Sequence, residues 1–263
     1  MKITVIGAGN MGGAIARGLV AFPSPSGGVC RPSDITCTAR SAGTLQKFSE
    51  QGFCVTTSNR EAVAGADVII FAVKPWMMEE VVREVAGFID SGRQIVASVA
   101  AGVSFAQLKS WLGFPAAMFR IIPNTAIEVG SGVTFISSCN ASSVQRSTIL
   151  DMFSQMGYAL EVDEEKMAAG TALASCGIAY AMKYIQASAA GGEALGISSE
   201  QACRIVEYTV KGAAELLLST GNPPQTEIDK VTTPGGMTQK GLAAMEDAGF
   251  SEAVRQGLEA SLK

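Results

Sequence analysis

The sequence predicts an α/β fold, in which an N-terminal Rossmann-like, doubly wound and mostly parallel sheet is followed by an all-α C-terminal domain. From residue 1 to about 160, short β-branched runs alternate with helical patterns, which is typical of βαβ units. Beyond Asp163 this alternation disappears, and apolar residues recur at helical spacing among many Ala, Met, Glu and Leu. We therefore expect one domain over residues 1–162 and a second, all-helical domain over 163–263.

The first domain is expected to contain eight strands. Several are apolar on both faces, such as the run 68–73, as in central strands that helices cover on both sides. A segment rich in Pro, Ser and Gly at 22–33 predicts an exposed loop between the first helix and the second strand. The expected strands are 2–6, 35–39, 53–56, 67–71, 94–98, 118–122, 132–136 and 157–161.

The second domain is expected to contain a helix over about 164–195, a helix that ends near Ser219, and a last helical stretch over 238–263. Gly196 and the segment 221–224 separate them. Four glycines lie inside the first of these helices, where each costs about 1 kcal/mol relative to Ala. Close helix packing, a kink or a subunit interface would each explain them.

Composition excludes several classes of function. The 263 residues carry a net charge of −4, which offers no basic face to nucleic acid. There is no histidine, so Ser-His-Asp hydrolysis, Cys-His proteolysis and His-ligated zinc are excluded. Six cysteines lie without a C-x-x-C pair, and we interpret them as small buried hydrophobes in a reducing compartment rather than as metal ligands.

The N-terminal residues predict no targeting segment. Lys2–Ile6 is already strand-like, which leaves no room for a signal peptide. No segment approaches the roughly 20 apolar residues that cross a bilayer. We therefore expect a cytoplasmic protein with neither a membrane nor a nucleic-acid partner.

The segment 7–12 reads Gly-Ala-Gly-Asn-Met-Gly, which is G-x-G-x-x-G placed after a strand and at the start of a helix. The glycines of this motif serve a tight turn, the close approach of a pyrophosphate and the packing of helix on strand. The motif opens a βαβ unit, so we predict dinucleotide binding by Gly7, Gly9, Asn10, Met11 and Gly12.

The end of the second strand distinguishes between the two nicotinamide dinucleotides. NAD binding usually needs an Asp or Glu there for the ribose, whereas this strand ends in Arg40-Ser41. A cation followed by a hydroxyl suits the extra phosphate of NADP. We predict that NADPH is preferred and that NADH use is possible; alternatively, Arg40 is an ordinary surface charge.

Two further segments are candidates for the cofactor site. Ala72, Val73, Lys74 and Pro75 follow an apolar strand, at the edge where open α/β sheets bind ligands, although a solvent-facing Lys74 would be equally ordinary. Asn59 follows the third strand and is a weaker candidate for the adenosine end.

The segment 231–238 reads Val-Thr-Thr-Pro-Gly-Gly-Met-Thr and interrupts the helical half of the chain. A plain connector with Thr as helix cap is one interpretation. Alternatively, free N–H groups of Gly235, Gly236, Met237 and Thr238 at a helix start could hold a carboxylate. The hydroxyls of Thr233 and Thr238 would then orient a second polar atom.

This segment, together with Gly241-Leu242, resembles the V-[ST]-[ST]-P-G-G-x-T signature of the pyrroline-5-carboxylate reductases, which make proline. The similarity extends over nearly the whole chain in order, through the segments 7–12, 72–75, 100–103, 120–125 and 209–214. The resemblance implies that NADPH reduces the imine of 1-pyrroline-5-carboxylate to L-proline.

The resemblance also implies a role for each part of the turn. The substrate carboxylate would lie on Thr233–Met237, and Thr238 would hydrogen-bond the ring nitrogen as the catalytic residue. The missing histidine agrees with this, since a protonated imine is already electrophilic. Members of the family form homodimers through interlocked helical domains, and some form larger rings of dimers.

The chain departs from the family pattern in one segment. Residues 174–180 read Ala-Ser-Cys-Gly-Ile-Ala-Tyr where the family usually has Ser-Gly-Ser-Gly-Pro-Ala-Tyr, and Gln186 replaces a Glu. We assign this segment a packing role, with Cys176 an inert thiol. Two alternative functions are a β-hydroxyacid dehydrogenase with Lys183 as its catalytic residue and a non-catalytic NADP-binding sensor.

Overall fold

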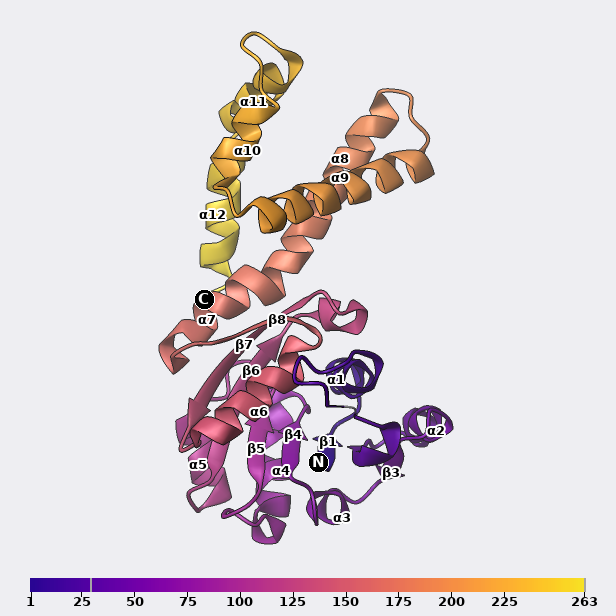
Figure 1. Cartoon of the computed structure of the whole chain (residues 1–263), viewed down its shortest axis with the longest axis vertical. Coiled ribbons are helices and arrows are strands. Elements are labelled where there is room, and N and C mark those ends of the chain that lie inside the picture. Colours follow the sequence, from indigo (N-terminus) through magenta and orange to yellow (C-terminus); the bar gives the residue numbers. More distant parts are fainter. Residues whose placement is uncertain (29, 263) are drawn as a thin grey trace. The chain divides into compact units, whose positions relative to one another are not determined.

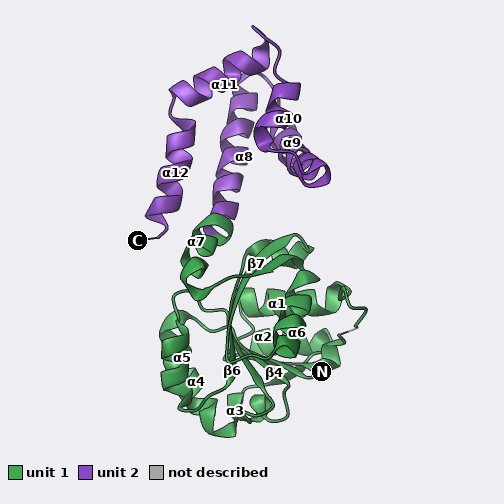
Figure 2. Ribbon diagram, turned by 60° about the vertical axis from the view of Figure 1, so that its left-hand side comes forward, with its two compact units in different colours: residues 1–175 green, residues 176–263 purple. Residues whose placement is uncertain are grey.

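The computed structural model describes residues 1–28 and 30–262. The chain forms two compact units, Met1–Ser175 and Cys176–Lys263 (Figure 2). The first unit is an α/β domain, and the second consists of helices.

The first unit contains one eight-stranded sheet in the order β3-β2-β1-β4-β5-β6-β7-β8. All eight predicted strands are present (Figure 1). Among the strand pairings of the described residues, that of β6 with β7 is antiparallel and the others are parallel. These two strands pair from Met118↔Cys139 to Pro123↔Thr134, which is why both run past their predicted ends. The strands are β1 (Ile3–Ile6), β2 (Ile35–Thr38), β3 (Cys54–Thr56), β4 (Val68–Phe71), β5 (Ile95–Ser98), β6 (Ala117–Pro123), β7 (Gly132–Cys139) and β8 (Gly157–Glu161).

Both faces of the central strands are buried. In β4, Val68 and Ile70 face one hydrophobic cluster, whereas Ile69 and Phe71 face another. Because successive side chains of a strand point to opposite faces, this alternation requires a helical layer on each side of the sheet.

The helices of the first unit supply those two layers. Ile15 and Ile149, from α1 and α6, lie in the first cluster; Val82 and Leu108, from α4 and α5, lie in the second. Ser104 and Ser142 start α5 and α6 with capping boxes. The helices are α1 (Asn10–Ala21), α2 (Ala42–Glu50), α3 (Asn59–Val63), α4 (Met78–Val85), α5 (Phe105–Leu112) and α6 (Ser143–Ser154).

The predicted loop at 22–33 is largely without regular structure, and Val29 lies outside the described residues. A short 3-10 turn, Pro32–Asp34, ends it. Ser26 donates its hydroxyl to Asp151 of α6 over 2.8 Å, and Ser24 donates to the same carboxylate. These contacts hold the loop to the domain.

The helix predicted over 164–195 is confirmed as an uninterrupted helical stretch over 164–194, but it is not α-helical throughout. It consists of a 3-10 turn (Glu164–Lys166), α7 (Met167–Gly170), a π-helical segment (Thr171–Cys176) and α8 (Gly177–Ala194). A Cβ on Gly170 would lie 2.6 Å from the Phe135 ring, so α7 packs directly on β7.

Polar contacts also hold the 164–175 segment to the sheet. Arg120 of β6 pairs with Glu164 at 2.8 Å. Ser175 donates its hydroxyl to the Pro123 carbonyl over 3.3 Å. The first helical residue after β8 is Glu164, close to the predicted boundary at 162. The two compact units nevertheless divide at 175/176, because the 164–175 segment stays attached to the sheet.

The second unit continues with α9 (Ser199–Thr220), α10 (Pro224–Lys230), α11 (Met237–Asp247) and α12 (Phe250–Ala260). The last helical stretch, predicted as one over 238–263, is two helices. Gly249 separates them at φ +84°, a left-handed conformation that favours glycine. Gly192 is explained by packing, because a Cβ there would lie 3.1 Å from that of Ala202 on the neighbouring helix.

The second unit buries little of its own apolar surface. Within its described residues, the buried hydrophobic side chains are those of Ala189 and Ala202. Large apolar residues are exposed on every helix from α8 to α12 or beside it. These include Met182, Tyr184, Leu195, Ile205, Tyr208, Leu216, Leu218, Met237, Met245, Phe250 and Val254.

The cysteines only partly follow the expectation of small buried hydrophobes. Cys37 is buried, and its burial raises the pKa of its thiol to about 12. Cys54 is exposed because β3 is the edge strand of the sheet, and the other four are half-buried. Among the described residues no cluster of three metal-ligating side chains occurs, and no described helix is long and apolar enough to span a membrane.

Candidate cofactor and substrate sites

The predicted cofactor residues gather where the strand order reverses. From β1 the chain passes to β2 on one side, and β4 lies on the other side, with Ile6 paired to Phe71. The loops that follow β1 and β4, residues 7–9 and 72–75, therefore share the carboxyl edge of the sheet. This is the switch point at which open α/β sheets bind ligands.

Steric contacts explain two of the three motif glycines. Gly7 has φ +95°, and a Cβ there would lie 2.8 Å from Val73 Cγ1. A Cβ on Gly12 would lie 2.3 Å from the Gly7 carbonyl oxygen and 2.9 Å from Ala72 Cβ. The loop after β1 therefore packs on the loop after β4 at a distance that no larger residue permits.

Gly9 is different, because a Cβ there would meet no atom within 4 Å. Gly9 is also the N-cap of α1 and has no side-chain cap. The N–H groups of the first helical turn, including those of Asn10 and Met11, have no partner within the helix. Open space beside uncapped N–H groups at the positive end of a helix fits a diphosphate.

Arg40 and Ser41 follow β2 at the same edge, and both are exposed. Ser41 is the N-cap of α2, where its hydroxyl accepts from the Thr44 N–H over 3.4 Å. In the described part of the chain Arg40 takes part in none of the ion pairs. Its guanidinium is therefore available to an anionic ligand.

Asn59, at the start of α3, is held by protein groups on both sides of its amide. Its Oδ1 accepts from the Thr38 hydroxyl over 2.8 Å, and its Nδ2 donates to Glu84 Oε2 over 2.9 Å. Thr38 in turn contacts Gly7. Sequence reasoning did not identify Thr38 or Glu84, because this contact joins β2, α3 and α4 only in the folded chain.

The four residues after β4 fall into two pairs. Ala72 and Val73 are half-buried and form the wall against which the glycine loop packs. Lys74 and Pro75 are exposed and begin a 3-10 turn, Pro75–Met77. Trp76 within this turn is 79% exposed, so it supplies an aromatic side chain at this edge of the sheet.

The predicted substrate turn lies in the second unit, and one expectation about it is wrong. The N–H of Gly235 donates to Gln239 Oε1 over 2.6 Å, and that of Gly236 donates to the Thr233 carbonyl over 2.9 Å. These two groups are therefore already paired. The N–H groups of Met237 and Thr238, in the uncapped first turn of α11, are left for a ligand.

The turn is built around two glycines. Gly235 has φ +72°, and a Cβ on Gly236 would lie 2.3 Å from Thr233 Oγ1. The residues predicted to bind substrate are mostly exposed, with Met237 at 91%. Lys183, the candidate of the dehydrogenase alternative, lies on α8 and donates to Gln186 Oε1 over 2.9 Å.

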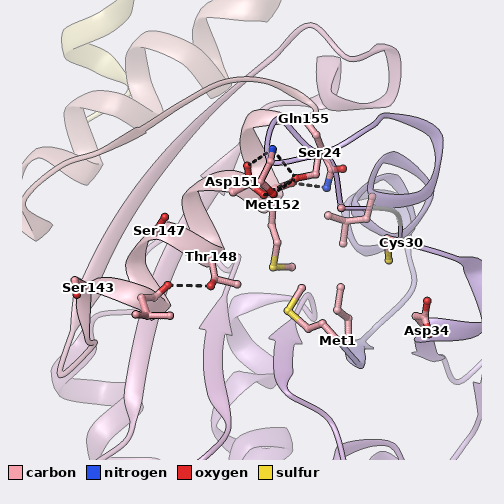
Figure 3. Close-up of a pocket in the computed structure, with 15 residues that line it drawn as sticks. Met1, Ser24, Cys30, Asp34, Ser143, Ser147, Thr148, Asp151, Met152 and Gln155 are labelled. Carbon is pink, nitrogen blue, oxygen red and sulfur yellow. Dashed lines mark hydrogen bonds between the residues drawn. The ribbon is translucent and has the colours of Figure 1, made fainter.

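A pocket of about 640 Å³ lies at the opposite edge of the sheet, at the amino end of β1 (Figure 3). Met1, the 22–33 loop and α6 line it, and it contains none of the predicted site residues. The two carboxylates that line it, Asp34 and Asp151, already accept hydrogen bonds from protein groups. The Arg31 guanidinium holds the pKa of Asp34 below its usual range, and the Ser24 hydroxyl does the same for Asp151. We assign no ligand to this pocket.

Two protein-family models match the chain. Residues 164–263 match the model described as pyrroline-5-carboxylate reductase dimerisation. Residues 2–102 match the model described as NADP oxidoreductase coenzyme F420-dependent. The second match contains the glycine loop and the residues that pack on it.

Known proteins resemble the chain over nearly its whole length. It is 36% identical over 273 residues to pyrroline-5-carboxylate reductase 1 of Dictyostelium discoideum, which covers 98% of this chain and 48% of that protein. The chain thus spans about half the length of that relative. It is 35% identical over 265 residues to pyrroline-5-carboxylate reductase of Arabidopsis thaliana, covering 100% of this chain and 93% of that protein.

Solved structures agree with these relatives. A pyrroline-5-carboxylate reductase from Coxiella burnetii superposes with a TM-score of 0.90 at 30% identity, over 99% of this chain and 96% of that one. The Plasmodium falciparum pyrroline carboxylate reductase with NADP bound gives a TM-score of 0.87 at 26% identity, over 100% of this chain and 95% of that one. The protein therefore belongs to the pyrroline-5-carboxylate reductase family.

Proposed function

We propose that this protein reduces the imine of 1-pyrroline-5-carboxylate to L-proline with NADPH. The observation that carries the proposal is the glycine loop at the β1/β4 switch point, open at Gly9, in a chain of this family. When bound, NADPH supplies the hydride that reduces the imine carbon.

The chain's own residues would hold and orient this cofactor. Asn10 and Met11 would offer backbone N–H groups at the positive end of α1 to the diphosphate. Gly9 would let the diphosphate approach closely, because its own N–H already donates to the Gly7 carbonyl over 2.8 Å and a Cβ there would meet open space. Ala72 and Val73 support the loop from β4. They would also line the middle of the cofactor. Arg40 and Ser41 would bind the phosphate on the adenosine ribose, which favours NADPH over NADH.

The substrate would be held by the turn at the start of α11. The N–H groups of Met237 and Thr238 are supported as carboxylate donors because the helix has no side-chain cap. Thr233, Gly235 and Gly236 shape the turn. The Thr238 hydroxyl would hydrogen-bond the ring nitrogen, and the cationic imine then needs orientation more than a strong acid.

We further propose that the helical half, residues 163–263, binds the substrate and forms a homodimer. The support is its exposed apolar surface together with its match to a dimerisation model. Exposed apolar side chains in this number are unfavourable in water unless a second surface covers them. Ile205, Tyr208 and Leu216 follow one face of α9 at helical spacing and are all exposed.

The first prediction concerns the reaction and its cofactor. The wild-type protein should oxidise NADPH only when 1-pyrroline-5-carboxylate is added, with proline as the product. Arg40→Asp should lower kcat/KM for NADPH by about ten- to a hundredfold, since a charge-assisted hydrogen bond is lost, and change the NADH value much less. Lys47→Asp on α2 is the control. Equal changes for both cofactors would remove Arg40 from the site.

The second prediction separates two glycines of the motif. Gly9→Ala should leave the melting temperature within a few degrees, because its Cβ enters open space, yet weaken NADPH binding about tenfold or more. Gly12→Ala should lower the melting temperature itself, because its Cβ would overlap the Gly7 carbonyl. Calorimetry and fluorescence titration measure both effects. Unchanged NADPH affinity in Gly9→Ala would contradict the assignment.

The third prediction concerns Thr238. Thr238→Ala should lower kcat by about tenfold or more and raise KM for the imine less, because the hydroxyl contact strengthens as charge changes on the nitrogen. Thr232→Ala is a matched control, since that hydroxyl donates to the Ile228 carbonyl over 2.7 Å within the fold. Steady-state kinetics with an unaltered kcat would exclude a catalytic role for Thr238.

The fourth prediction concerns assembly. Light scattering should give at least twice the 27.2 kDa chain mass for the wild-type protein. Ile205→Glu should shift the mass toward the monomer, because the new charge lies on the surface to be covered, whereas Ile205→Leu should not. A monomeric wild-type protein, or an Ile205→Glu variant of unaltered mass, would exclude this interface.

A further inference from the structure

We propose that Glu84 is a positioning residue for the cofactor loop and that it acts through Asn59 and Thr38. The inference rests on the proposed function, since it concerns how the same glycine loop is held for NADPH. It is carried by a chain of side-chain hydrogen bonds that runs from α4 to the loop after β1.

This series of hydrogen bonds begins at the glycine loop. The N–H of Gly7 donates to the Thr38 carbonyl over 3.1 Å and to the Thr38 hydroxyl oxygen over 3.3 Å. The Ala8 N–H donates to the same carbonyl over 2.7 Å. Thr38 is 2% exposed, so its hydroxyl must be satisfied by protein groups.

Glu84 fixes the direction of every hydrogen bond in the chain. A carboxylate only accepts, so the Asn59 amide must turn its Nδ2 toward Glu84. Asn59 Oδ1 then faces Thr38 and receives the single hydroxyl proton. The Thr38 oxygen is thereby left as an acceptor for the Gly7 N–H. Without Glu84 the amide could reverse, and the buried hydroxyl proton would lose its acceptor.

The position of Gly7 matters for binding because the loop is sterically tight. Gly7 lies against Val73 and Ala72 at φ +95°. Its carbonyl accepts from the Gly9 N–H over 2.8 Å, so a shift of Gly7 would move Gly9 with it. Glu84 itself is about one third exposed and lies 4.0 Å from the Arg60 guanidinium. It is therefore held in place without being part of the loop.

The direction in which NADPH affinity changes when the Glu84 carboxylate is removed distinguishes a positioning role from a purely electrostatic one. NADPH is an anion, so a carboxylate that acted only by its charge would repel it, and removal of that carboxylate would tighten binding. Removal would also free Arg60, which again favours the anion. A positioning role predicts the opposite result, namely weaker binding.

The experiment compares Glu84→Ala, Glu84→Gln and Glu80→Ala. Glu80 is an exposed residue of the same helix and takes part in none of the ion pairs in the described part of the chain, so it controls for charge and helix surface. Fluorescence titration with NADPH alone, melting temperature, and kcat with KM for NADPH are measured for each. Glu84→Ala should bind NADPH about five- to tenfold more weakly, with kcat unchanged at saturation.

Glu84→Gln should bind NADPH more weakly than wild type but more tightly than Glu84→Ala, because its Oε1 can still accept from Asn59 whereas its Nε2 can also donate and no longer imposes one orientation on that amide. Adding Glu84→Ala to Asn59→Ala should change the affinity no further, since the effect passes through Asn59. Three results would overturn the inference. The effects of Glu84→Ala and Asn59→Ala on NADPH affinity could be fully additive, Glu84→Ala could bind NADPH as tightly as wild type or more tightly, or Glu84→Gln could bind as weakly as Glu84→Ala. A wild-type protein that binds no NADPH would instead overturn the proposed function, and that failure is seen before any substitution.

Discussion

The close approach of the loop after β1 to the loop after β4 is the constraint on which the cofactor site depends. Neither Gly7 nor Gly12 has room for a Cβ, because Val73, Ala72 and the Gly7 carbonyl already occupy that space. The contact is possible only because β1 and β4 are neighbours in a parallel sheet whose order reverses there. The Gly7 carbonyl also accepts from the Gly9 N–H over 2.8 Å, so the residue with open space beside it is tied to this contact.

Polar contacts from outside the motif complete the site. Thr38 ties the glycine loop to β2, and Asn59 and Glu84 extend that tie to α3 and α4. Residues 25 positions apart in the chain thus act on one loop. A dinucleotide site of this kind is a property of the sheet edge, and the G-x-G-x-x-G motif is the part of it that is contiguous in sequence.

The two units obtain their stability in different ways. The first buries a hydrophobic cluster on each face of its sheet, with Phe71 and Phe119 fully covered. The second exposes large apolar side chains on α8, α9, α11 and α12, and within its described residues only small alanines are buried. Burial of apolar surface is the main favourable term in folding, so association is the natural way for the second unit to gain it.

The sequence by itself determined the α/β class, all eight strands and the switch to helix after Glu161, because periodicity and β-branched runs are local signals. It also determined the three motif glycines and the Thr-Thr-Pro-Gly-Gly turn, which are contiguous. It did not reveal the π-helical segment at 171–176, the separation of α11 from α12, the pairing of the Gly235 and Gly236 N–H groups, or the hydrogen bond between Asn59 and Glu84. Only the tertiary structure decided these, since each depends on which backbone and side-chain groups meet after folding.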